Sequence, residues 1–351
     1  MCKSLLVYPL TMETVPLVRY QEYLVDYDEV IPVVDTGAGQ PKGYDVSHID
    51  GGSAYRVETI PGFGATVGSS NSVLFSINAQ NLENVRKYMS LVKGHAKQVF
   101  ICDETDEQLD CDFDDCYHLT FNSESMIDVG SKDRLLKIPV PVILVFGHGQ
   151  QCNKFDIQIG LRKKFQELGY KVSQVGTKKY SPLFGFHALP FYPNIPLWKK
   201  ILIYNRYFRG IVKAESPDVL IVGVPGGITA INEWHSEYFG ETAISVSKSL
   251  SPDVAIFSLY YGMLHSEYIN NVINYSKYAL DASPDYFHLS NSKLVFEEDM
   301  RSVSYLTTDS SKVLDGQEVT DSRLFNIFSQ HSTETVFEQV VCQLQCNIES
   351  F

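Results

Sequence analysis

The chain has 351 residues, 44% of them hydrophobic and 20% charged, and a formal net charge of −13. This is the composition of a globular protein rather than a disordered chain, and the length predicts roughly two domains. The negative charge argues against broad binding to nucleic acid or to anionic membranes. The sequence has no run of about 18 consecutive apolar residues and no recognisable signal peptide, so we expect a cytoplasmic protein without a membrane segment.

Neither the cysteines nor the acidic run of the sequence is predicted to form a disulfide framework or a metal site. The seven cysteines are an odd number scattered along the chain, so we expect reduced thiols rather than a disulfide framework. The acidic run at 102–115 lacks the regular spacing and the turn glycine of a calcium-binding loop. The sequence therefore predicts no metal site.

The first part of the chain alternates short apolar strands with helices. Strands are predicted at 4–10, 29–35, 72–77 and 98–103, and helices at 15–24 and 81–94. Such alternation is typical of a parallel sheet covered by helices. Residues 1–130 are therefore predicted to form a Rossmann-like or flavodoxin-like α/β domain.

Asp35 follows the second predicted strand, where a Rossmann unit places the acid that binds a ribose hydroxyl. The segment after the first strand, residues 8–16, contains no glycine, although the dinucleotide fingerprint needs glycines for close approach of the backbone. We therefore expect Asp35 to lie in a strand-end turn and not in a dinucleotide site.

The second part of the chain repeats the alternation. Strands are predicted at 137–147, 170–176, 217–227 and 252–262, and helices at 155–168, 197–215 and 335–345. The first of these strands is almost continuously apolar, as in a strand buried on both faces. Gly169 is placed to end the first helix as its C′ residue. Residues 131–351 are predicted to form a second α/β domain.

Residues 142–172 have the layout of a phosphate-binding loop: a strand, a loop with glycines, a helix and another strand. Gly147, Gly149 and Lys154 are present. In such loops glycines let backbone N–H groups surround phosphate oxygens, the helix N-terminus adds partial positive charge, and the lysine neutralises phosphate.

Three positions depart from a working magnesium–nucleotide loop. Asn153 replaces the glycine before the lysine, although Asn tolerates the left-handed backbone that the turn needs. Phe155 replaces the Ser or Thr that holds Mg²⁺, and Gly223 occupies the strand-end position of the acid that assists it. Hydrolysis of ATP by the ordinary route should therefore be much impaired.

The candidate site residues follow from this layout. His148 is the loop residue expected to titrate, Cys152 lies near a helix N-terminus that favours a thiolate, and Lys178 follows the next strand. The residues predicted to act in chemistry are His148, Cys152 and Lys154. The residues predicted to bind a ligand are Gly147, Gly149, Gln150, Gln151, Asn153, Lys154, Phe155, Lys178, Pro225, Gly226 and Gly227.

The runs "FGHGQQCNKFDIQIGLRKKFQELGYKVSQVGT", "GFHALP", "NRYFRGIVKAESPDVLIVGVPGGI" and "SPDVAIFSLYYG" resemble the clostridial peptide maturation system proteins. Those proteins are encoded beside radical-SAM enzymes and short bacteriocin-like precursor peptides. "LLVYPL" and "DYDEVIPVVD" fit the same family, so the resemblance covers most of the chain. More distantly, the layout resembles a family with a Rossmann-like domain and a dethiobiotin-synthetase-like P-loop domain, whose loop usually keeps Gly-Lys.

The resemblance implies a role in making a modified peptide, with a precursor peptide and other maturation enzymes as partners. It implies no reaction, and it leaves homo-oligomer formation open. Three functions remain: an altered P-loop site for a phosphate-bearing ligand, a non-catalytic peptide-binding scaffold with a vestigial P-loop, or an ATP-dependent ligase or kinase. ATP and coenzyme A are both candidate ligands, since the phosphates of coenzyme A need no catalytic Mg²⁺.

Overall fold

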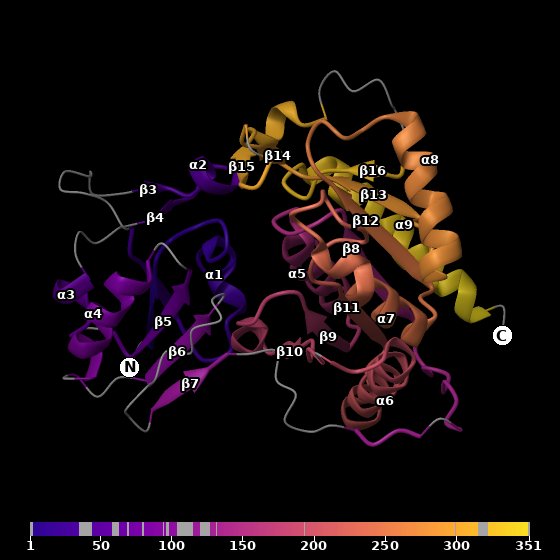
Figure 1. Ribbon diagram of the computed structural model, residues 1–351, viewed down its shortest axis with the longest axis horizontal. Coiled ribbons are helices and arrows are strands. Elements are labelled where there is room, and N and C mark those ends of the chain that lie inside the picture. Colours follow the sequence, from indigo (N-terminus) through magenta and orange to yellow (C-terminus); the bar gives the residue numbers. More distant parts are fainter. Residues whose placement is uncertain are drawn as a thin grey trace. The chain divides into compact units, whose positions relative to one another are not determined.

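The computed structural model describes most of the chain (Figure 1). The described residues are 3–34, 44–57, 63–68, 70–78, 81–93, 95, 98–103, 115–119, 127–130, 132–192, 194–298, 300–314 and 322–349. Asp35 and most of the acidic run at 102–115 lie outside them. No helix among the described residues is long and apolar enough to cross a membrane.

The chain divides into two compact units. The first comprises residues 1–122 and 179–188, and the second comprises residues 123–178 and 189–351. A short segment from the second half of the sequence therefore belongs to the first unit. The domain boundary at residue 130 stays a prediction.

The first unit is built on a parallel five-stranded sheet. Its order is β2 (Glu29–Pro32), β1 (Ser4–Tyr8), β5 (Ser72–Ile77), β6 (Gln98–Asp103) and β7 (Cys116–His118). One face of the sheet packs on α3 (Phe63–Thr66) and α4 (Leu82–Lys93). Buried aromatic rings fill this layer, with the Phe63 and Tyr88 rings stacked 4.4 Å apart. The predicted parallel, helix-covered sheet is confirmed.

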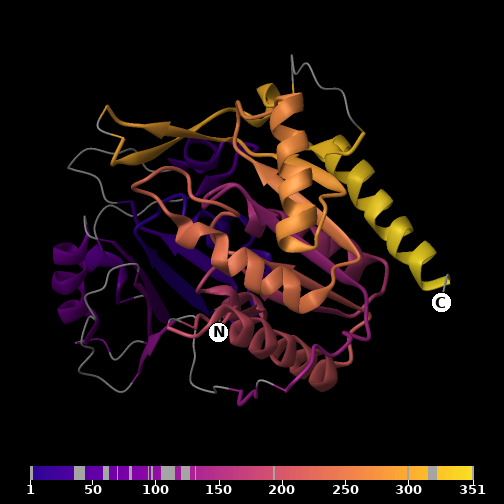
Figure 2. The ribbon, with the colours of Figure 1, turned by 45° about the vertical axis from the view of Figure 1, so that its right-hand side comes forward.

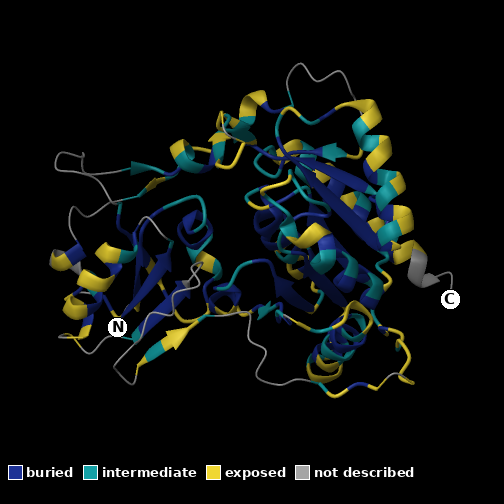
Figure 3. Ribbon diagram, viewed as in Figure 1, coloured by how far each residue is buried: buried dark blue, intermediate teal, exposed yellow. Residues whose placement is uncertain are grey.

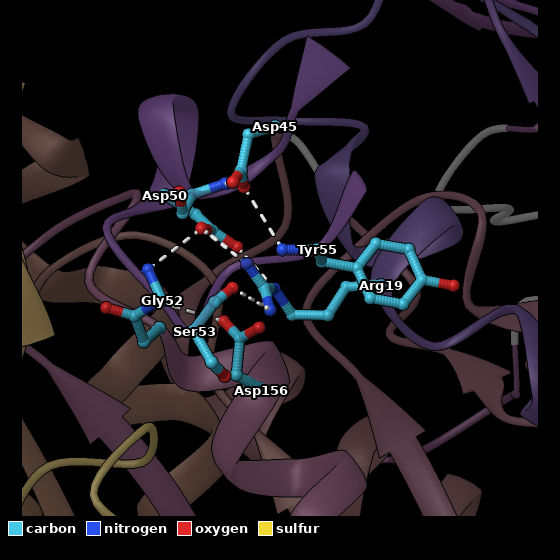
Figure 4. A network of polar contacts seen from close by, with 9 residues as sticks. Arg19, Asp45, Asp50, Gly52, Ser53, Tyr55 and Asp156 are labelled. Carbon is cyan, nitrogen blue, oxygen red and sulfur yellow. Dashed lines mark hydrogen bonds and ion pairs between the residues drawn. The ribbon is translucent and has the colours of Figure 1, made fainter. Parts of the chain in front are cut away.

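The first unit also contains several short elements, and Figure 4 shows polar contacts among residues on and between some of them. These elements are α1 (Val15–Arg19), η1 (Gln21–Tyr23), β3 (Tyr44–Asp45), α2 (Ser47–Asp50) and β4 (Arg56–Val57). Arg19 binds both carboxylate oxygens of Asp50, at 2.6 and 2.7 Å. Asp45 accepts the backbone N–H of Tyr55 at 3.0 Å, which closes the β3–β4 hairpin. The ion pair thus holds α2 against α1.

The second unit contains a longer parallel sheet. Six strands of this sheet belong to the second unit, in the order β9 (Val172–Gly176), β11 (Val219–Gly223), β8 (Val142–Gly147), β12 (Val254–Leu259), β13 (Tyr286–Leu289) and β16 (Leu324–Phe325). β8, which leads into the glycine loop, is central, and every residue of β8, β11 and β12 is buried (Figure 3). Their continuous apolar sequences follow from burial on both faces.

Helices cover both faces of this second sheet (Figure 2). One face packs on α5 (Lys154–Glu167) and α9 (Gln330–Glu349), and the other on α6 (Leu197–Glu215), α7 (Glu241–Leu250) and α8 (Ser266–Tyr275). Gly169 ends α5 with a φ of 85°, as predicted for a C′ glycine. The predicted fold class, two parallel α/β units in sequence, is confirmed.

Shorter elements complete the two units. They are η2 (Ser181–Phe184) and β10 (His187–Ala188) in the first unit, and η3 (Glu237–Gly240), η4 (Ser276–Leu280), β14 (Ser292–Phe296), β15 (Val303–Thr307) and η5 (Ser310–Lys312) in the second.

The cysteines differ in part from the expectation of reduced thiols. Cys102, Cys152, Cys342 and Cys346 are thiols and not half-cystines. Cys116 is disulfide-bonded, so the expectation is wrong for that residue.

Candidate functional site

The loop between β8 and α5 contains two non-glycine residues in left-handed conformation. Gln151 and Asn153 both have left-handed backbone, with φ of 51° and 61°. The Asn153 side chain fixes this geometry, because its Oδ1 accepts the hydroxyl of Ser290 at 2.6 Å and its Nδ2 donates to Asp156 at 3.1 Å. Asparagine therefore takes the conformation that glycine would otherwise supply.

The two loop glycines lie where no side chain fits. A Cβ on Gly147 would lie 2.8 Å from the Ser258 carbonyl oxygen, and one on Gly149 would lie 2.5 Å from the Tyr260 hydroxyl. The backbone N–H of His148 donates to the Ser258 carbonyl at 3.0 Å. Ser258 at the end of β12, and Tyr260 just after it, therefore leave room only for glycine at positions 147 and 149.

Lys154 is the first residue of α5, and only 5% of its surface is exposed. In the part of the chain that the structure describes, its ammonium has one hydrogen bond, to the carbonyl of Gly226, and no ion pair. Burial lowers the pKa of Lys154, while Cys152 and Glu237 act in the opposite direction. A buried ammonium without a carboxylate partner is costly, and such perturbed groups cluster at binding sites.

The strand-end position of the missing acid is closed to any side chain. A Cβ on Gly223 would lie 2.3 Å from Oε1 of Gln158 and 2.6 Å from Cγ2 of Thr177. Gln158 projects from α5 and donates to the Val175 carbonyl at 2.7 Å. Among the described residues its buried Oε1 has no hydrogen-bond partner. Gln158 thus occupies the space that an acid on β11 would need.

The loop after β11 packs directly on the loop between β8 and α5. A Cβ on Gly227 would lie 2.3 Å from the carbonyl oxygen of His148. Gly226 has a φ of 73°, and the N–H of Gly227 donates to Glu237 at 2.9 Å. The structure therefore brings Gly226 and Gly227 to Lys154, while Pro225 lies half-buried beside them.

His148 does not titrate near neutral pH. Burial, and then the charge of Lys154, lower its pKa to about 4. Its Nδ1 hydrogen-bonds the hydroxyl of Tyr268, whose own pKa burial raises to about 12. At pH 7 the pair is a neutral imidazole and a neutral phenol. The expectation of a group titrating near neutrality is wrong here, because the imidazole is largely buried and lies near a cation.

The remaining loop residues have mixed surroundings. Cys152 is 1% exposed, and its thiol donates to the Gly149 carbonyl at 3.1 Å. Gln150 is exposed, and its carbonyl accepts the Tyr260 hydroxyl. Phe155 is buried at the start of α5. The roles of these residues stay predictions.

Lys178 follows β9, is half-buried, and acts electrostatically on Lys154, so the two cations lie in one region. Sequence reasoning missed Gln158 and Glu237. Gln158 had a signal, since it lies four residues after Lys154 on one helix and therefore on the same face. Glu237 had none, because it lies in an irregular segment, 10 residues beyond Gly227.

No family model and no curated protein matches the sequence. Among solved structures, a DUF1611 family protein from Anabaena variabilis is similar with a TM-score of 0.53, at 11% identity over 82% of this chain and 88% of that chain.

Two further solved structures are more distantly similar. A nucleotide-binding protein from Archaeoglobus fulgidus in complex with ADP has a TM-score of 0.33, at 16% identity over 57% of this chain and 88% of that one. A GTPase from Pyrococcus abyssi has a TM-score of 0.28, at 15% identity over 42% of this chain and 66% of that one.

At these identities the likeness shows the fold alone, and only the first TM-score is high enough to carry weight. The similarity to the DUF1611 family structure, together with the strand order, supports the predicted architecture and agrees with the distant resemblance to a two-domain P-loop family. The chain therefore combines a Rossmann-like α/β unit with a second parallel α/β unit, in which the glycine loop joins the central strand β8 to helix α5.

Proposed function

We propose that the protein serves in the maturation of a ribosomally made, post-translationally modified peptide, and that its loop at 147–155 binds a phosphate-bearing ligand. The sequence resemblance supports the maturation role. It also implies a precursor peptide and other maturation enzymes as partners, and the cytoplasmic location stays a proposal from the sequence pattern. The ligand part rests on the geometry around Lys154.

The observation that carries the ligand proposal is the buried ammonium of Lys154, held only by the Gly226 carbonyl in the described part of the chain. A carbonyl oxygen neutralises no charge, so an incoming phosphate oxygen would replace it at a net gain. The loop also opens α5, whose first N–H groups and dipole favour an anion. The site is thus suited to a phosphate.

A non-catalytic peptide-binding scaffold remains the second candidate, because one loop of the second unit exposes large aromatic side chains. Trp234, Tyr238 and Phe239 are 51%, 65% and 74% exposed. Exposed aromatics of this kind are enriched at protein contacts. An ATP-dependent ligase or kinase is the third candidate, and it requires a metal-holding group other than Phe155 or Gly223.

Lys154→Met tests the proposal. We expect wild-type protein to be stabilised against thermal unfolding by at least one of ATP, GTP and coenzyme A, by about 2.7 kcal/mol at a hundredfold excess over Kd. The variant should lose this stabilisation. Without ligand it should be as stable as wild type or more stable, because methionine keeps the packing and removes the buried charge.

Lys163→Met is the matched control, since Lys163 is exposed on the same helix and its loss should leave ligand binding unchanged. A purely structural Lys154 would show the reverse pattern: a destabilised Lys154→Met protein, with no ligand effect in wild type. That result would remove the phosphate proposal and favour the scaffold, which binding of the precursor peptide would then test directly.

A further inference from the structure

Two opposite charges lie on either side of one peptide group beside the loop. The carbonyl of Gly226 accepts the Lys154 ammonium, and the N–H of the same peptide, on Gly227, donates to the Glu237 carboxylate at 2.9 Å. Glu237 is close enough to act electrostatically on Lys154, although the two form no ion pair. A phosphate that reached Lys154 would therefore meet a carboxylate.

The backbone that carries Glu237 is strained. Glu237, Tyr238 and Phe239 are three successive non-glycine residues with left-handed φ of 45°, 50° and 54°. Left-handed backbone costs roughly 1–2 kcal/mol per residue, and such strain is retained mainly at functional sites. Gly240, with a φ of 74°, closes against the Ile228 carbonyl, where a Cβ would lie 1.9 Å away. The position of the Glu237 carboxylate is thus held by a backbone segment whose conformation is energetically unfavourable.

The usual position for such a carboxylate is closed. Gln158 and Thr177 leave no room for a side chain on Gly223, the residue at the end of β11. An acid that serves the loop must then reach it from another segment. Glu237 does so through Gly227, whose Cα packs on the loop carbonyl of His148.

We infer that Glu237 replaces the missing strand-end acid and makes the site selective for a polyphosphate that carries a divalent cation, as in a magnesium–nucleoside triphosphate. This inference rests on the proposed function and names its ligand class. For a phosphate without metal, the carboxylate offsets part of the attraction that Lys154 exerts. Mg²⁺ bound between the phosphate and the carboxylate removes this effect, because Mg²⁺ accepts one or two carboxylate oxygens together with phosphate oxygens and waters.

Glu237→Gln is the variant that tests the inference, because glutamine can still accept the Gly227 N–H and so preserves the loop. Affinities for ATP and ADP are measured by calorimetry with Mg²⁺ and with EDTA, and coenzyme A is measured in parallel. Mn²⁺ electron paramagnetic resonance in the presence of ADP reports the metal directly. Glu233→Gln is the control, since Glu233 is an exposed acid of the same loop.

Wild type should bind ATP at least about tenfold more tightly with Mg²⁺ than with EDTA, a difference within reach of one close charge. Glu237→Gln should reduce the ratio of the two ATP affinities, with Mg²⁺ and with EDTA, to about one, because it tightens metal-free binding and weakens metal-bound binding. The spectrum of protein-bound Mn²⁺ should disappear in this variant. Glu233→Gln should behave as wild type. Glu237→Asp keeps the charge, so this variant should still bind ATP more tightly with Mg²⁺ than with EDTA, although by a smaller factor than wild type.

Three results would overturn the inference while leaving the proposed function intact: ATP binding that is equal with and without Mg²⁺, equal weakening of both forms by Glu237→Gln, or coenzyme A binding that surpasses magnesium–ATP. If no phosphate ligand binds wild type under either condition, the proposed function fails, and the role of Glu237 fails with it.

Discussion

Buried polar residues support the loop between β8 and α5 from strands β12 and β13. His288 on β13 is fully buried, and its Nδ1 lies 2.8 Å from the hydroxyl of Ser258. Among the described residues its Nε2 has no partner, and burial lowers the pKa of His288 to about 3. Ser258 in turn donates to the carbonyl of Cys152. His288 thus supports the loop as a neutral imidazole.

The buried neutral His288 should make the protein less stable as the pH falls. The folded pKa of His288 lies below the unfolded value of about 6.5, so the unfolded chain binds the proton first. Its contribution to stability is therefore full above about pH 6.5 and falls as pH drops towards 3. In wild type, His288 should lower the free energy of unfolding by roughly 1.4 kcal/mol per pH unit as the pH falls from 6 to 4, and His288→Asn should abolish this contribution.

The measurement is the free energy of unfolding by urea at several pH values, taken as the difference between wild type and variant so that the carboxylates cancel. His331→Asn, at an exposed position on α9, is the control. A difference between wild type and His288→Asn that stays constant across this range would show that His288 is not neutral in the folded state.

At the scale of elements, the helices and strands with a simple apolar pattern were predicted well. β5, β6 and α6 have the predicted bounds. The helix predicted at 15–24 ends instead at Arg19, because Tyr20 leaves helical geometry with a φ of −118°. The C-terminal helix α9 is longer than predicted.

α7 escaped prediction because its buried face is rich in serine. Ser245 and Ser249 are buried, and each donates its hydroxyl to a carbonyl of the same helix, to Glu241 and Val246 at 2.6 Å. A hydroxyl satisfied within the helix can face a core without an outside partner. The hydrophobic pattern of such a face is weak, although the face is buried.

The left-handed segment of η3 yields a prediction at this scale. Phe239 is 74% exposed, so removing its ring costs little packing, while its φ of 54° strains any residue except glycine. Phe239→Gly should therefore be about 1 kcal/mol more stable than Phe239→Ala, the matched variant that keeps the strain. Equilibrium urea unfolding of the two variants measures this. Equal stability would mean that the backbone is not strained there.

At the scale of the whole molecule, each unit has its own core. Phe75 in the first unit packs on the ring of Phe63 at 5.4 Å, and Phe257 in the second packs on that of Phe146 at 5.1 Å. Both Phe75 and Phe257 are fully buried. Two separate parallel sheets with separate hydrophobic cores are expected to unfold as separate cooperative units.

Phe75→Ala and Phe257→Ala form a matched pair for this expectation. Each should cost about 3–5 kcal/mol in its own unit. Hydrogen exchange followed by mass spectrometry should show faster exchange in β5 for the first variant and in β8 for the second, with the other unit unchanged. Faster exchange in both strands for either variant would mean that the chain unfolds as one unit.

The sequence by itself determined the local features of the site. Alternating strands and helices required parallel sheets, and the apolar run before Gly147 required a strand buried on both faces. Lys154 at a helix start, Asn153 in left-handed backbone and Gly169 at the helix end were all readable, because these features depend on neighbours within a few residues.

Only the tertiary structure decided what surrounds Lys154. Gly226 lies 72 residues away in sequence and reaches the ammonium because β11 pairs with β8. Gln158 fills the space beside Gly223 because α5 packs on that sheet, and Glu237 approaches through a segment without periodic pattern. Contacts of this range depend on strand order and packing, which short-range sequence patterns do not contain. These contacts place the Gly226–Gly227 peptide between the buried Lys154 ammonium and the Glu237 carboxylate.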